Sequence, residues 1–146
     1  MPLPSGSVVP ETPWFELRVA VLLAAVRLLL PRIGLVATLQ RFAKPAPVAV
    51  PKAPDATAAV DAVRRAARRT GGGTCLAQSV VLTALLMRAG VEPDIVLGCR
   101  RYEDGHWGAH AWVEVDGRLL EPVEAGVHTE LTRCRASAQW RLDTAR

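Results

Sequence analysis

The chain has 146 residues and a formal net charge of +4, with 50% hydrophobic and 22% charged residues. This length allows one domain with a modest core and excludes two full domains, and the composition is typical of a globular protein. The positive charge would suit nucleic acid. However, the arginines gather on one predicted helix with almost no aromatic residues to stack on bases, so we expect no nucleic-acid partner.

The three cysteines indicate the cellular compartment in which the protein is located. Cys75, Cys99 and Cys134 form no CxxC pair, and an odd number does not close into a disulfide framework. The opening residues, MPLP, also lack the basic and apolar regions of a secretory signal. These features predict a reducing, cytoplasmic location.

The first predicted elements are two apolar helices, at 14–30 and 33–42, with Pro31 ending or kinking the first. Charged residues divide them into runs shorter than the roughly 18 apolar residues of a membrane span, so we expect no stable membrane insertion. Residues 1–43 therefore read as an N-terminal helical hairpin whose apolar faces cover the domain or dock a partner protein.

A Pro-rich linker, residues 44–54, separates this hairpin from the main domain, predicted at 55–146. Asp55 should cap a helix over 56–69, with alanines and valines on one side and arginines on the other. A glycine-rich loop then leads into Cys75, which opens a helix that is apolar nearly all round and ends at Gly90.

Strands are predicted at 95–99 and 109–115, with a loop at 102–108 between them. Asp116-Gly117 is a strong hairpin signal before a third strand at 118–123. From residue 124 onward the pattern is too weak to assign. The predicted fold class is α+β, with the buried cysteine-bearing helix packed on a small antiparallel sheet.

Cys75 is the candidate nucleophile because it would stand in the first turn of that helix. Unpaired N–H groups and the positive end of the helix dipole stabilise a thiolate there, and the same groups can bind the oxyanion that forms when the thiolate attacks an amide. By position alone, a small structural cysteine in an apolar helix fits equally well.

The strand at 109–115 places His110, Trp112 and Glu114 on one face and apolar residues on the other. A strand histidine beside a tryptophan is more often structural than catalytic, but together with Cys75 it predicts a thiol and general-base pair.

An acid should orient the imidazole of His110. A two-residue turn at Asp116-Gly117 makes Val115 pair with Arg118, and therefore sets Glu121 diagonal to His110, roughly 7–8 Å away at the backbone. Asp116 would lie roughly 20 Å along the strand. Glu121 is the predicted third residue, provided that the strand register holds.

Three strings together resemble a known family: CLAQS at 75–79, VLG at 96–98 and AHAWVEVDG at 109–117. They resemble the stand-alone leader peptidases of bacterial lasso-peptide biosynthesis, within the transglutaminase-like superfamily of cysteine peptidases. The resemblance covers roughly residues 55–123 and implies a transglutaminase-like, papain-like fold. The family usually has an aspartate as third residue, where this chain has Glu121.

The resemblance implies a cytoplasmic hydrolase without a cofactor, which cuts a ribosomally made precursor peptide between leader and core. The implied partners are this precursor, a small leader-binding recognition protein and an ATP-dependent lasso cyclase. Candidate substrate-binding residues are Gln78, His106, Trp107 and Trp112.

Other functions remain open. Transglutaminase-like sites also perform acyl transfer, and a non-enzymatic adaptor of a peptide-maturation complex could keep the same fold. A metal site drawn from Cys99, His106 and His110 lacks the paired ligands of a structural zinc motif, so we expect no metal.

Overall fold

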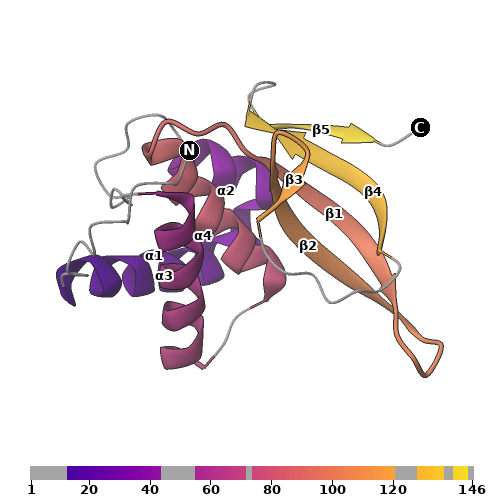
Figure 1. Ribbon diagram of the computed structural model, residues 1–146, viewed down its shortest axis with the longest axis horizontal. Coiled ribbons are helices and arrows are strands. Elements are labelled where there is room, and N and C mark those ends of the chain that lie inside the picture. Colours follow the sequence, from indigo (N-terminus) through magenta and orange to yellow (C-terminus); the bar gives the residue numbers. More distant parts are fainter. Residues whose placement is uncertain (1–12, 44–54, 72–73, 121–127, 137–139, 145–146) are drawn as a thin grey trace, which may run out of the picture.

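The computed structural model describes residues 13–43, 55–71, 74–120, 128–136 and 140–144. These residues form four helices followed by five strands, with the helices gathered on one side of an antiparallel sheet (Figure 1). The helices are α1 (Pro13–Ile33), α2 (Leu35–Phe42), α3 (Ala56–Arg69) and α4 (Cys75–Arg88). The strands are β1 (Asp94–Arg101), β2 (Trp107–Val115), β3 (Arg118–Leu119), β4 (His128–Arg135) and β5 (Arg141–Thr144). The predicted α+β class is confirmed.

The break between the first two helices lies at Gly34 and not at Pro31 as predicted. Pro31 is accommodated in the last turn of α1, where the loss of one N–H group disturbs little of the helix. Gly34 has a φ of 83°, a left-handed conformation that glycine adopts without strain, and its N–H still bonds to the carbonyl of Leu30 at 3.0 Å. The chain therefore turns there into α2.

One face of α1 belongs to the main core. Its buried residues join a single cluster with α3, α4 and the sheet, so α1 packs on α3 and α4. They are Val19, Leu22, Leu23 and Val26. The opposite side of α1 is also apolar but exposed, with Trp14, Leu17, Val21 and Leu28 facing solvent. None of the described helices combines the length and the apolarity needed to cross a bilayer. The predicted linker at 44–54 lies outside the described residues.

The helices α3 and α4 have the predicted caps and faces. The Asp55 carboxylate accepts a hydrogen bond from the N–H of Ala58 at 2.8 Å. In α4, the side chains from Val80 to Leu86 are buried, which confirms that it is the central helix of the core. It packs on α1 and α3 at one side and mainly on β2 at the other.

The sheet has the order β3-β2-β1-β4-β5. The hairpin register is confirmed, since Val115 pairs with Arg118 and both Asp116 and Gly117 have positive φ, as a type I′ turn requires. The strands β1 and β2 extend beyond their predicted ends to Arg101 and Trp107, because their pairing continues to the tip of the hairpin. Two strands were missed by the sequence analysis, β4 and β5, and β4 pairs along the full length of β1.

Candidate active site

Cys75 is the first residue of α4 and is half-buried. The hydroxyl of Thr74 accepts a hydrogen bond from the N–H of Ala77 at 3.1 Å, and the first intrahelical bond runs from Gln78 to the carbonyl of Thr74. The N–H groups of Cys75 and Leu76 therefore precede the helical hydrogen-bond ladder. They are placed to bind an oxyanion formed beside the thiol, together with the positive end of the helix dipole.

His110 lies on β2 opposite Gly98 of β1 and is half-buried. Its face is the one turned away from Val113, which packs in the core with α4. In the described part of the sheet, β3 pairs with Glu114 and Val115, and the residues that would continue this strand beside His110 lie outside the described residues. The elements that carry Cys75 and His110, α4 and β2, are in contact (Figure 1), and His110 lies on the face of β2 opposite to Val113.

The side chain of Trp112 packs beside His110. Its ring is stacked with the imidazole at a centroid distance of 5.9 Å and an interplanar angle of 25°. It is only 6% exposed, because it lies over Gly98, where a Cβ atom would come within 2.7 Å of the indole. Its predicted place on the His110 face is confirmed, but it offers a peptide a buried wall rather than an open surface.

This close approach gives a testable prediction for Gly98→Ala. The new Cβ would lie 2.4 Å from the carbonyl oxygen of Thr129, a backbone atom that cannot rotate away. We expect the strands β1 and β4 to shift and unfolding to become easier by about 1–3 kcal/mol, as for other overpacked sites. Chemical denaturation and near-UV circular dichroism of the indoles would measure both effects.

The matched control is Gly108→Ala in the same hairpin. There the added methyl group meets only the ring of Tyr102, an exposed side chain that can rotate aside. Equal stability of the two variants would contradict the packing role of Gly98.

The indole of Trp112 is hydrogen-bonded to a network of charged side chains. The indole N–H donates to Glu114 at 3.0 Å, and the other carboxylate oxygen of Glu114 accepts from Arg133 at 3.3 Å. Arg133 also donates to Asp94 at 2.9 Å and to both carboxylate oxygens of Glu130 at 2.6 and 2.7 Å. The hydrogen bond from Arg133 lowers the pKa of Glu130, and the same bond raises the pKa of Arg133. Nothing in the sequence indicated that Arg133 bonds to Glu114 beside Trp112, because the strand β4, which carries Arg133, was not predicted.

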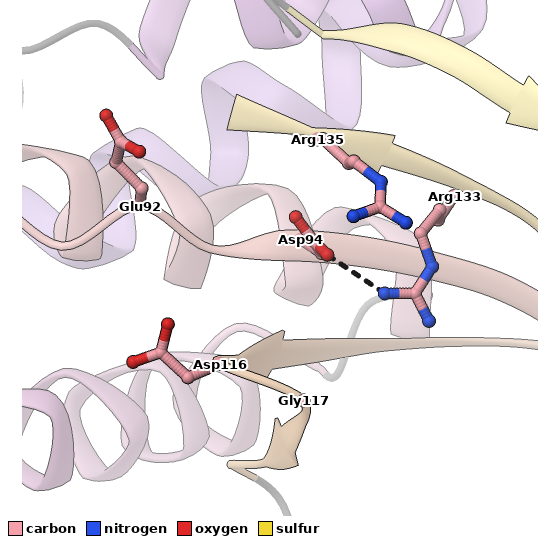
Figure 2. Close-up of a pocket in the computed structure, with 6 residues that line it drawn as sticks. All are labelled: Glu92, Asp94, Asp116, Gly117, Arg133 and Arg135. Atoms are coloured by element: carbon pink, nitrogen blue, oxygen red, sulfur yellow. Dashed lines mark hydrogen bonds and ion pairs between the residues drawn. The ribbon is translucent and has the colours of Figure 1, made fainter. Parts of the chain in front are cut away.

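Part of this network borders a cavity of about 380 Å³ at the far end of the sheet (Figure 2). Figure 2 shows Asp94 bonded to Arg133, with Arg135 beside them and Asp116 on the turn. Asp116 lies six residues from His110 along one strand and its turn, roughly 20 Å away. It therefore lines this distant cavity and does not orient His110.

Glu121, the predicted third residue, lies outside the described residues. The last described hydrogen bond of the hairpin joins the N–H of Leu120 to the carbonyl of Val113 at 3.2 Å. Up to that point the register is the one from which the assignment of Glu121 was derived.

The other predicted substrate-binding residues occupy two separate places. His106 and Trp107 lie at the exposed tip of the β1–β2 hairpin. The His106 ring stacks on Tyr102 at 4.4 Å and contacts the carboxylate of Asp104, and Trp107 opens β2 with 57% of its surface exposed. Gln78 lies one turn into α4, where it lines a cavity together with residues of α3.

The metal set considered from the sequence is not brought together. Cys99 pairs with Ala109 and His110 with Gly98, so their side chains point to opposite faces of the sheet. Among the described residues, no group of three or more potential ligands is arranged to hold a metal ion.

The described chain therefore has a half-buried cysteine at the start of a core helix, followed by an antiparallel sheet that carries a histidine. The model of one family, described as the transglutaminase-like superfamily, matches residues 20–136. The chain therefore belongs to the transglutaminase-like superfamily, which includes cysteine peptidases and acyltransferases. No curated protein and no solved structure matches the chain significantly.

Proposed function

We propose that this protein is a cysteine endopeptidase that removes the leader from a ribosomally made lasso-peptide precursor. The observation that carries the proposal is the position of Cys75 at the N-terminus of α4, in contact with the strand that carries His110 within the string HAWVE. Membership of the superfamily supports the cysteine chemistry. The resemblance of the strings at 75–79, 96–98 and 109–117 to lasso-peptide leader peptidases supports the choice of substrate.

The proposed reaction has two stages. The thiolate of Cys75 attacks the carbonyl carbon of the leader–core peptide bond, and the N–H groups of Cys75 and Leu76 bind the oxyanion. His110 protonates the departing amine, the C–N bond breaks, and the core peptide leaves. Water, deprotonated by His110, then hydrolyses the thioester and releases the leader with a free carboxylate.

The stacked ring of Trp112 holds the imidazole of His110 in place, and Glu114 and Arg133 hold Trp112. Glu121 is the proposed acid behind His110. The proposed partners are a small leader-binding protein that delivers the precursor and an ATP-dependent cyclase that uses the freed core.

Incubation of the protein with its precursor, with and without the leader-binding protein, tests the function. We expect mass spectrometry to show two products whose masses add up to the mass of the precursor plus one water. A leader joined to an added primary amine would instead indicate acyl transfer, and an unchanged precursor in the presence of both partners would contradict the peptidase.

Alkylation by iodoacetamide separates the enzyme from a non-enzymatic adaptor. We expect Cys75 to be labelled before Cys99 and well before Cys134, whose thiol is 0% exposed and whose pKa is raised by burial. Peptide mapping after short exposure would measure the order. Equal, slow labelling of Cys75 and Cys99 would favour the adaptor.

A further inference from the structure

A cavity of about 330 Å³ lies beside the candidate nucleophile, between α3 and α4. Its described lining consists of Arg64, Ala67, Arg68 and Gln78. Gln78 follows Cys75 by three positions on α4, and residues at this spacing lie on one face of a helix with their Cβ atoms roughly 5–6 Å apart. The cavity therefore begins within one helical turn of the thiol.

The charges around this cavity are not those of a uniformly solvated arginine face. The four arginines of α3 divide into two pairs, each with the i, i+4 spacing that shares a side of the helix. Arg65 and Arg69 form ion pairs with Glu16 of α1. Arg64 and Arg68 line the cavity instead, and neither makes an ion pair within the described part of the chain.

We propose that this cavity is a subsite for a carboxylate of the peptide substrate, an Asp or Glu side chain close to the cleaved bond. Guanidinium groups match the planar carboxylate with parallel hydrogen bonds, and the amide of Gln78 offers a polar wall. The N-terminal end of α4 adds its positive dipole to the same place. This inference rests on the proposed peptidase function and specifies which residues that enzyme accepts.

Two small electrophiles test the subsite without the precursor. N-bromoacetyl-aspartic acid amide and N-bromoacetyl-asparagine amide have the same size and reactive group and differ by one charge. In each case the Cys75 thiolate displaces bromide, so an S–C bond forms and a C–Br bond breaks. We expect the acidic reagent to alkylate Cys75 about tenfold faster, because two partly exposed ion pairs each contribute a factor of about two to five.

The preference should fall to about one in the double variant Arg64→Gln/Arg68→Gln and should weaken with added salt. Arg65→Gln/Arg69→Gln is the matched control: it also removes two charges from α3, but both side chains pair with Glu16 and neither lines this cavity. We expect this control to keep the full preference.

The outcomes distinguish a failure of the subsite proposal from a failure of the peptidase proposal. Equal rates of Cys75 alkylation by the two reagents in the wild-type protein, or an equal loss of preference in all variants, would overturn the subsite. The peptidase proposal would stand in either case. Failure of Cys75 to react faster than Cys99 with both reagents would instead contradict the proposed nucleophile.

Discussion

The variant Cys75→Ala is expected to lose leader cleavage by about 10⁴-fold or more, because removal of the nucleophile leaves only binding and oxyanion stabilisation. The thiol is half-buried at a helix terminus, and alanine favours helix, so the fold should be retained. Single-turnover assays with excess enzyme, followed by mass spectrometry of the leader and core, would measure the loss. Circular dichroism and thermal unfolding would show that the protein remains folded.

Cys99→Ala is the matched control for this variant. Cys99 is also a half-buried cysteine, but it lies within the strand β1 and not in the first turn of a helix. We expect cleavage close to that of the wild-type protein. Cleavage by Cys75→Ala at the wild-type rate would refute the proposed mechanism.

The second large effect is expected for His110→Ala, which should lower kcat for cleavage by about 10²–10⁴-fold, the usual contribution of a general acid and base. His110→Gln tests the same role while it keeps a planar polar group against Trp112. Both variants should bind the precursor with unchanged affinity, since the imidazole acts on protons in the transition state and not on the leader. Steady-state kinetics and binding titrations with the Cys75→Ala background would separate the two effects.

The acid behind His110 is tested by Glu121→Gln beside its control, Asp116→Asn. We expect the first to reduce turnover more than the second, since Asp116 lines the cavity at the far end of the sheet. For the preceding prediction, turnover by His110→Ala at the wild-type rate would contradict the role of His110. A larger effect of Asp116→Asn would contradict the choice of Glu121.

Local patterns predicted the parts of this fold that depend on neighbours in the chain. The cap at Asp55, the apolar helix that opens at Cys75 and the turn at Asp116-Gly117 all follow from short-range chemistry, and all are present. The turn also set the register of its hairpin, because a two-residue connection leaves only one pairing of the flanking strands.

Contacts between distant segments could not be predicted in this way. The strand β4 has polar or charged residues at successive positions, such as Thr132 and Arg133, so it shows no simple alternation, and its pairing with β1 and β5 is what identifies it as a strand. The hydrogen bonds that link Arg133 through Glu114 to Trp112 likewise join β4 to β2, two strands with β1 between them. Such a contact has no signature in the sequence of any one of them.

The sequence by itself determined which residues are candidates for catalysis, since a cysteine at a helix start and a histidine in an alternating strand are recognised from their own neighbours. The tertiary structure decided what surrounds them. It stacked His110 against a buried Trp112, and it divided the arginines of α3 between Glu16 and a cavity beside Cys75. The physical reason is that helix caps and turns form from adjacent residues. Contacts between strands and cavities between helices exist only after separate elements have packed together.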